Sequence, residues 1–367
     1  MTARLHVAVA GAGIVGAAIA HALALRGARV TIVDAAPACG ASAASFGWIN
    51  ASFAESEAYF ALRRAAVEEW HAAAHLRGPA GPRWGGSLWW EEEGAALEAQ
   101  AALLAQRGHR AEVIGQEAFR RLAPQVADPP PAAIHALTEG AVDAADVARH
   151  LAGLAAQAGA TLFAGPRVTG LIRSGERVRG LLTTHGEVRA DETVIALGAA
   201  TGGLLAGFGV PLAMDNRAGL ILHTLPVAPM LDHLILAPDI HFRQERDGRI
   251  VAGEIFSGDG PGAPRITDAP GELAADLLRR LDARLPAAGG LRIGRVMLGL
   301  RPVPADGFPA IGRPEGMTGL TVAAMHSGVT LGPLVGRLVA EELLEGAVSP
   351  LLAEFRPARF AGPRDQG

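Results

Sequence analysis

The feature that most constrains the fold is a glycine-rich turn between two short apolar runs near the start of the chain. The first run, residues 5–10, leads into the turn at residues 11–16, and an alanine-rich helical stretch follows. A second apolar run, residues 29–33, ends at Asp34. A strand, a glycine turn, a helix, a second strand and an acid together form the βαβ unit of a dinucleotide site.

Each part of this unit has a physical role in the predicted site. Gly11 allows the tight turn, Gly13 lets backbone amides approach a pyrophosphate, and Gly16 lets the helix and the strand pack closely. The start of the helix offers partial positive charge to the phosphates. Asp34 is placed to accept hydrogen bonds from ribose hydroxyls. The unit by itself leaves open whether the ligand is NAD or FAD.

Length and charge limit the class of protein. The chain has 367 residues and a formal net charge of −4, which fits two or three domains and, without a basic block, argues against a nucleic-acid partner. The apolar run at residues 7–20 is shorter than the roughly 18 residues that a membrane span needs. Its glycine spacing fits a strand and a helix better than a secretory signal. With Cys39 as the single cysteine, we expect a cytoplasmic protein without a membrane span.

The residue inventory excludes several chemistries. The chain contains no lysine, so all 33 basic residues are arginines. Schiff-base catalysis through lysine and a phosphate-binding P-loop are therefore excluded. The sequence also lacks the His-Glu-x-x-His and paired-cysteine spacings of metal sites and the Gly-x-Ser-x-Gly turn of serine hydrolases, so no metal is expected.

Dinucleotide-type segments lie at both ends and in the middle of the chain, with β-rich segments between them. NAD dehydrogenases usually keep the dinucleotide half contiguous, whereas FAD proteins of the p-hydroxybenzoate-hydroxylase-like type return to it repeatedly. We therefore predict an α/β fold in which a discontinuous Rossmann-like FAD-binding domain is interleaved with an α+β substrate domain built on an antiparallel sheet. The predicted FAD-binding domain comprises residues 1–81, 140–210 and 299–367, and the substrate-binding domain comprises residues 82–139 and 211–298.

Two C-terminal stretches are more specific than the glycine turn. They read GLRPVPADGFPAIG (residues 299–312) and TVAAMHSGVTLGP (residues 321–333). Together with the βαβ unit and the apolar strand that ends at Ala196–Gly198, they resemble the FAD-dependent D-amino-acid oxidase family, which includes glycine oxidase, sarcosine oxidase and D-amino-acid dehydrogenase. The resemblance implies an FAD-dependent enzyme that oxidises the C–N bond of an amino acid or secondary amine. It leaves the electron acceptor open among oxygen, a quinone and a partner protein.

The resemblance also implies roles for individual residues. Arg301, in the Gly-x-Arg-Pro motif, corresponds to the arginine that commonly holds the substrate carboxylate, and a planar guanidinium can do so through two parallel hydrogen bonds. His326, before the last glycine turn, is a candidate to touch substrate or flavin, or to be satisfied by backbone. Strand alternation puts His241 and Arg243 on one face, which either lines the pocket or faces solvent. The candidate catalytic residues are Arg301, His326, His241 and Arg243.

The cofactor-binding prediction follows the same segments. The small-residue loop at residues 40–50 is expected to run past the pyrophosphate toward the flavin ring, and the last helix to aim its positive end at that ring. The candidate cofactor-binding residues are Gly11, Gly13, Ile14, Val15, Gly16, Asp34, Ala35, Ser42, Ala43, Ala44, Ser45, Gly47, Trp48, Val168, Ala196, Gly198, Arg301, Ser327, Gly328, Val329 and Thr330.

The chain departs from the family at several positions. Relatives that attach flavin covalently use a histidine in the N-terminal loop or a late cysteine. This chain has Ser45-Phe46-Gly47 in the loop and only Cys39, so we expect non-covalent FAD. It lacks the lysine of the sarcosine-oxidase branch, and Tyr59 is its only tyrosine, so the substrate cannot be copied from a relative. Two alternatives remain from the sequence: an NAD(P)-dependent dehydrogenase and a non-catalytic FAD-binding subunit of a heteromeric amine dehydrogenase.

Overall fold

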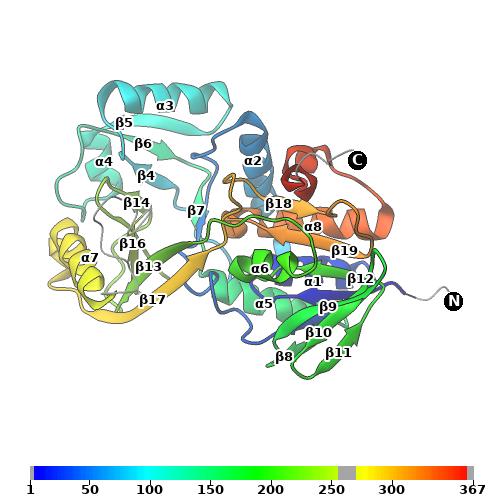
Figure 1. Cartoon of the computed structure of the whole chain (residues 1–367). Helices are drawn as coiled ribbons and strands as arrows, with labels where there is room; N and C mark the ends of the chain where they lie inside the picture. The colour runs from blue at the N-terminus through cyan, green and yellow to red at the C-terminus, as the bar shows by residue number, and fades with distance from the viewer. Residues whose placement is uncertain (1–3, 255–269, 362–367) are drawn as a thin grey trace.

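A six-stranded sheet forms one half of the molecule in the computed structural model, which describes residues 4–254 and 270–361 (Figure 1). Its strand order is β18-β19-β12-β1-β2-β8, and every neighbouring pair is parallel except β18 and β19. The strands are β1 (His6–Ala10), β2 (Arg29–Asp34), β8 (Thr161–Ala164), β12 (Glu192–Ile195), β18 (Ala310–Gly312) and β19 (Leu320–Ala324).

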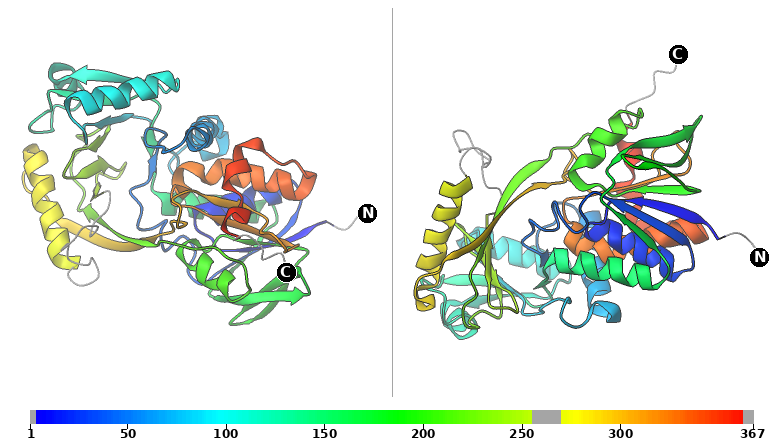
Figure 2. Two further views of the ribbon diagram at one scale, coloured as in Figure 1. Left: turned by 45° about the horizontal axis from the view of Figure 1, so that its top comes forward. Right: turned by 90° about the horizontal axis from the view of Figure 1, so that it is seen from below.

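Both faces of this sheet are covered, which explains why its central strands are continuous apolar runs. Val7 and Val9 of β1 pack into a cluster with helices, whereas Ala8 and Ala10 pack against a three-stranded sheet (Figure 2). Gly336 allows close helix packing, because an added Cβ would lie 2.7 Å from the Ala18 carbonyl carbon. The covering elements are α1 (Ile14–Leu25), α2 (Glu57–Ala72), α5 (Ala144–Gln157), α6 (Thr201–Ala206), α8 (Gly328–Glu345), β9 (Val168–Ser174), β10 (Arg177–Thr183) and β11 (Gly186–Arg189).

An eight-stranded sheet forms the other half, in the order β17-β13-β16-β15-β14-β4-β6-β5. Neighbouring strands are antiparallel except β14 and β4, so the predicted antiparallel sheet contains one parallel pair. Its strands are β4 (Ser87–Trp89), β5 (Ala111–Gly115), β6 (Ala132–Ala136), β13 (Arg217–Thr224), β14 (Leu234–Leu236), β15 (His241–Gln244), β16 (Ile250–Gly253) and β17 (Ile293–Arg301). The helices α3 (Gly94–Gln106), α4 (Gln116–Leu122) and α7 (Pro270–Arg284) lie beside it, and β3 (Trp48–Ile49) pairs with β7 (Gly140–Ala141) near the middle of the molecule.

The predicted α/β architecture agrees with this arrangement. The strands of the six-stranded sheet come from three separate parts of the chain, and those of the eight-stranded sheet come from the segments between them. The predicted boundary at 298/299 falls inside β17, which continues without a break to Arg301. The buried strand expected to reach Gly198 ends at Ile195. The division into two domains stays a prediction, and we propose that each sheet is the core of one of them. Within the described residues, no helix combines the length and apolarity needed to cross a bilayer.

His21 of α1, with His75 and His150 nearby, makes stability sensitive to acid. Burial, together with the neighbouring charges of His75, His150 and Arg26, lowers the pKa of His21 to about 4. The unfolded chain takes up this proton near the ordinary value of 6.5, so stability is present above pH 6.5 and is lost as the pH falls toward 4.

We therefore expect the wild-type protein to lose about 3 kcal/mol of unfolding free energy through His21 between pH 7 and pH 4. His21→Leu should reduce the fall in Tm across this range, as measured by thermal unfolding at several pH values. The exposed His185→Gln serves as the control, since it should leave the pH dependence unchanged. An unaltered pH dependence in His21→Leu would contradict the assignment.

Candidate functional site

Two positions of the glycine turn between β1 and α1, Gly11 and Gly16, have no room for a side chain. Gly11 has a φ of +105°, and an added Cβ would lie 2.3 Å from the carbonyl oxygen of Ala196. A Cβ on Gly16 would lie 2.0 Å from the carbonyl oxygen of Gly11. The turn therefore presses against the end of β12, where Gly198, at a φ of +57°, begins the next turn. The predicted close approach of backbone at both strand ends is present.

Asp34 holds this turn in shape. Its Oδ2 accepts a hydrogen bond from the Ala12 amide at 2.6 Å, and its Oδ1 accepts one from the Ala36 amide at 2.8 Å. The Ile14 amide, at the start of α1, donates to Ser42 Oγ at 3.1 Å. Each carboxylate oxygen can accept more than one hydrogen bond, so Asp34 can bind ribose hydroxyls while it orders the turn.

A cavity of about 410 Å³ opens beside Asp34. A dinucleotide fits this part of the molecule, because Asp34, which lines the cavity, binds the Ala12 amide of the glycine turn just before the start of α1. Three of the predicted cofactor residues line it, Asp34, Ala35 and Val168, and its other members were not predicted. The cavity is lined by Val33, Asp34, Ala35, Arg167, Val168, Leu197, Ala200, Gly203 and Leu204.

The small-residue loop after β2 lies between the two sheets. Its Ala44 packs against β17, since a Cβ on Gly299 would lie 2.5 Å from Ala44 Cβ. Gly47 has a φ of +76°, and its Cβ would lie 1.9 Å from the Val142 carbonyl oxygen. Ser45 Oγ accepts a hydrogen bond from the Gly47 amide at 3.0 Å. The side chain of Ala43 packs against the hydrophobic core. The loop therefore runs from the glycine turn to the eight-stranded sheet, as a flavin-binding segment requires.

Arg243 fastens this loop to the eight-stranded sheet. Its Nε donates to the Phe46 carbonyl at 2.5 Å and its Nη2 to the Val142 carbonyl at 3.0 Å, and Nη2 lies 2.8 Å from Glu245 Oε1. The side chain is almost fully buried. These contacts favour a structural role for Arg243 over the catalytic one expected from the sequence. His241 shares its face as predicted, and its ring lies 6.2 Å from the Phe46 ring.

A fully buried carboxylate, Glu139, holds the end of this loop and the residues that follow it. It accepts hydrogen bonds from Trp48 Nε1 at 3.0 Å, Ser52 Oγ at 2.6 Å and Ser87 Oγ at 2.7 Å, and His109 Nε2 lies 3.4 Å away. Burial alone would raise the pKa of this carboxyl, but His109 and the two hydroxyls hold the pKa below its ordinary value. Sequence reasoning missed Glu139, because its partners lie far from it in the chain.

The start of α8 lies next to the start of α1. A Cβ on Gly328 would lie 3.1 Å from Val15 Cγ2, and Tyr59 OH donates to Ser327 Oγ at 2.8 Å. No side chain caps α8 among the described contacts of Ser327. The first amides of a helix lack partners within the helix, so two partially positive ends meet where the predicted cofactor would bind.

Thr330 contributes to this region through its backbone, because its hydroxyl is already engaged. Thr330 Oγ1 donates to the Trp48 carbonyl and accepts from the Asn50 amide, each at 3.3 Å. The carbonyls of Val329 and Thr330 accept from Trp70 Nε1 at 3.1 and 3.0 Å. If Val329 and Thr330 contact the cofactor as predicted, they therefore do so through their backbone amides.

Arg301 ends β17, which reaches with β13 toward the middle of the molecule (Figure 1). It pairs across the strands with Arg217, and Gly299 pairs with Gly219. The guanidinium crosses Gly219, where an added Cβ would lie 3.0 Å from Arg301 Nε, and its Nη2 donates to the Glu254 carbonyl at 3.0 Å. The half-buried side chain lies on the sheet face that carries Gly299 and therefore faces the small-residue loop at residues 40–50, which we call the flavin loop.

Positive charge gathers around His326. Burial, followed by the charges of Arg301, Arg63 and Arg217, lowers the pKa of His326 to about 4. The imidazole is therefore neutral at pH 7, although its side chain stays accessible to solvent. Arg63, another residue without a sequence signal, bonds to the Asn50 side chain and backbone. The region favours an anionic ligand.

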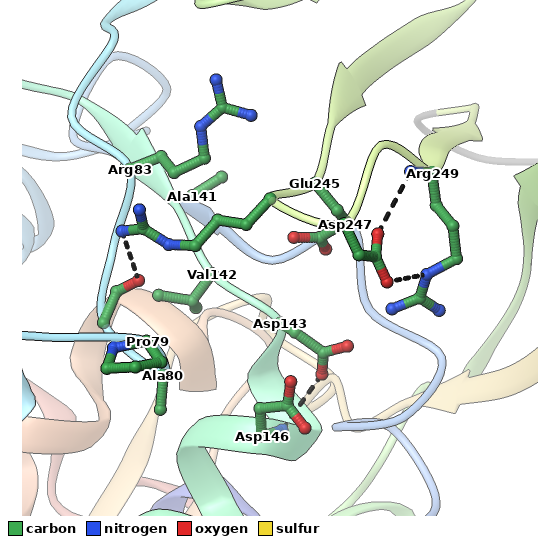
Figure 3. Close-up of a pocket in the computed structure, with 12 residues that line it drawn as sticks. Pro79, Ala80, Arg83, Ala141, Val142, Asp143, Asp146, Glu245, Asp247 and Arg249 are labelled. Atoms are coloured by element: carbon green, nitrogen blue, oxygen red, sulfur yellow. Dashed lines mark hydrogen bonds and ion pairs between the residues drawn. The ribbon is translucent and has the colours of Figure 1, made fainter. Parts of the chain in front are cut away.

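A second, smaller pocket of about 100 Å³ lies where the segments around residues 79–83, 141–146 and 245–249 meet (Figure 3). Its charged side chains already have partners. Asp143 caps α5, and Asp247 pairs with Arg249 at 2.6 Å. This pocket is too small and too well paired to be the substrate site. Across residues 4–254 and 270–361, His, Cys, Asp and Glu side chains form no group of three suited to a metal ion.

Comparison with known proteins identifies the family. Residues 6–342 match the DAO family, described as FAD dependent oxidoreductase. The chain is 30% identical to the glycine oxidase of Geobacillus kaustophilus over 99% of both chains. The crystal structure of a glycine oxidase from that organism superposes with a TM-score of 0.84 at 28% identity. This superposition covers 98% of this chain and 99% of the other.

A second relative matches over a shorter stretch. The glycine oxidase of Pseudomonas aeruginosa is 32% identical over 196 residues, so the match spans about half the length of either chain, 52% of each. The DAO match, in contrast, covers the glycine turn, both sheets and Arg301. The chain therefore belongs to the DAO family of FAD-dependent oxidoreductases.

Proposed function

We propose that this FAD-dependent enzyme oxidises the C–N bond of an amino acid or a secondary amine. The observation that carries the proposal is the position of Arg301, whose side chain lies on the sheet face that is turned toward the flavin loop. A guanidinium there can take a substrate carboxylate through two hydrogen bonds and so fix the orientation of the carbon that bears the amine. Named relatives that act as glycine oxidases support an amino-acid substrate.

FAD supplies the hydride acceptor, flavin N5, when it is bound. We propose that it is held non-covalently by the glycine turn, Asp34, the loop at residues 42–48 and the amides that begin α8. Arg301 orients the substrate, and neutral His326 adds a polar contact without repelling a cation. The oxidised substrate is an imine, which water hydrolyses to a 2-oxo acid.

Family membership removes the NAD(P)-dependent alternative, since the DAO family uses FAD. The match to a glycine oxidase over 99% of both chains supports a catalytic protein over the non-catalytic subunit. We propose a cytoplasmic location from the single cysteine. The electron acceptor remains open among oxygen, a quinone and a partner protein, and an oxygen electrode read alongside a dye-linked assay distinguishes them.

The direct test is a visible spectrum of the purified protein, followed by anaerobic addition of glycine, sarcosine, proline and a panel of D-amino acids. The proposal predicts a yellow protein whose flavin absorbance bleaches with at least one of these amines. Heat denaturation should release the flavin into the supernatant if it is non-covalent. A yellow protein that no amine bleaches would contradict the proposed activity.

Gly219 should prove necessary for the position of Arg301. Gly219→Ala puts a methyl group 3.0 Å from Arg301 Nε and 3.2 Å from Nη2, so the guanidinium must shift. A misplacement of this size is expected to raise KM about tenfold for a carboxylate substrate, measured by steady-state kinetics. Gly153→Ala on α5 is the matched control, because an added Cβ there meets nothing within 4 Å. An unchanged KM in Gly219→Ala would show that Arg301 tolerates the methyl group.

A further inference from the structure

His241 lies on the same sheet face as Arg301. It pairs directly with Gly253 of β16, Gly253 pairs with Ile221 of β13, and Ile221 pairs with Met297 of β17. Directly paired residues share a face, and alternate residues along β17 continue that face to Arg301. The His241 side chain therefore faces the flavin loop, in agreement with its contact to the Phe46 ring.

The guanidinium of Arg301 reaches toward the strand opposite His241. Its Nη2 donates to the carbonyl of Glu254, the residue that follows Gly253. Because Gly253 is the direct partner of His241, the anion-binding group and the imidazole lie over adjacent strands. Gly253 carries no side chain on this face, and Ile221 Cδ1 packs over it, 2.8 Å from the position of an added Cβ. A substrate held by its carboxylate on Arg301 would have its amine within reach of this imidazole.

A carboxylate orients the imidazole. Glu91 Oε1 lies 2.7 Å from His241 Nε2, and both side chains are largely buried. A carboxylate on one ring nitrogen keeps the proton on that side and leaves the other nitrogen as an acceptor. The polar contact of His241 lies on Nε2, with Glu91, and within residues 4–254 and 270–361 no hydrogen bond involves Nδ1. The pair therefore has the arrangement of a base and the group that orients it.

The proposed reaction needs such a base at neutral pH. An aliphatic amine has a pKa near 10, so at pH 7 only about one molecule in a thousand carries a free lone pair. The C–H hydride can leave only when that lone pair is available to form the imine. A side chain that takes the ammonium proton in the site would remove this limit.

We propose that His241, oriented by Glu91, is the general base that deprotonates the substrate ammonium group. An N–H bond of the ammonium breaks, its electron pair stays on the substrate nitrogen, and the proton bonds to His241 Nδ1 before passing to water. The step is a proton transfer and needs no oxidant. It rests on the proposed function. Glu91 is the charged group in contact with His241, and further charges nearby are Arg243 with Glu245, Arg301, and Glu254 with Arg280.

The test is the pH profile of kcat/KM for the FAD-loaded wild type, His241→Gln and Glu91→Gln between pH 6 and pH 10.5. His241→Gln should lose about 100-fold at pH 7 and recover to within a few-fold of the wild type near pH 10, where the amine is deprotonated in solution. Glu91→Gln should lose about tenfold at pH 7 and recover in the same way. The exposed His185→Gln, between β10 and β11, should follow the wild-type profile.

A binding measurement separates this role from simple packing. Benzoate carries the carboxylate but no amine, so its effect on the flavin spectrum should give the same Kd in His241→Gln as in the wild type. A loss of kcat/KM that is equal at all pH values, a loss of benzoate affinity, or no loss at pH 7 would each overturn the proposal. If His241→Gln does not fold, the profile of Glu91→Gln decides. Failure of every amine to bleach the wild-type flavin would instead refute the proposed function.

Discussion

Arg301→Leu is expected to lower kcat/KM for an amino-acid substrate by about 10³-fold while the protein keeps its flavin. The truncation leaves the substrate carboxylate without its bidentate partner, a loss of about 4 kcal/mol in transition-state binding. Flavin should persist, because the glycine turn, Asp34 and the cavity beside Asp34 do not depend on Arg301. The measurement combines steady-state kinetics with the ratio of flavin to protein absorbance.

Two further variants make the result specific. Arg301→Lys keeps the charge but loses the planar fork, so it should recover only part of the activity. Arg295→Leu removes an exposed arginine from the same strand and should leave kcat/KM within about twofold. Equal activity of Arg301→Leu and the wild type would contradict the carboxylate role, and loss of flavin would show that Arg301 serves the cofactor instead.

The parts of the site that the sequence predicted are those whose physics is local. The turn at Gly11 and Gly16 needs backbone that only glycine supplies, and its glycines, flanked by apolar runs, are visible as a pattern. Strand alternation correctly put His241 and Arg243 on one face. Arg301 was predicted through its motif, and its substrate role stays a prediction. Its neighbour Gly219 had no such signal, because cross-strand register does not show in one strand's sequence.

The parts that sequence reasoning missed depend on long-range contacts. Glu139 meets Trp48 and Ser52, which lie 91 and 87 residues away in the chain. Arg243 was predicted to be catalytic; its partners Phe46 and Val142 lie 197 and 101 residues away and favour a structural role instead. A buried charge is stable only where distant donors converge, and no periodicity in the sequence reports that convergence.

Glu139→Leu should therefore be the most destabilising single substitution that we predict. It removes the acceptor for Trp48 Nε1, the hydroxyls of Ser52 and Ser87, and the amide of Ser52, and it leaves them buried without partners. Leaving several buried donors unsatisfied is expected to cost about 4 kcal/mol of unfolding free energy. Thermal unfolding should show a Tm lower by on the order of 10 °C.

Glu139→Gln distinguishes the charge from the shape. Its carbonyl oxygen can still accept from Ser52, but its amide meets Trp48 Nε1, a group that can only donate. We expect a loss of about 2 kcal/mol and weaker FAD retention, since Trp48 belongs to the flavin loop. Glu98→Gln, on the exposed side of α3, should change stability by less than about 0.5 kcal/mol. If Glu139→Gln were as stable as the wild type, the network would owe its stability to shape alone, and the carboxylate charge would have no role in holding the loop between the two sheets.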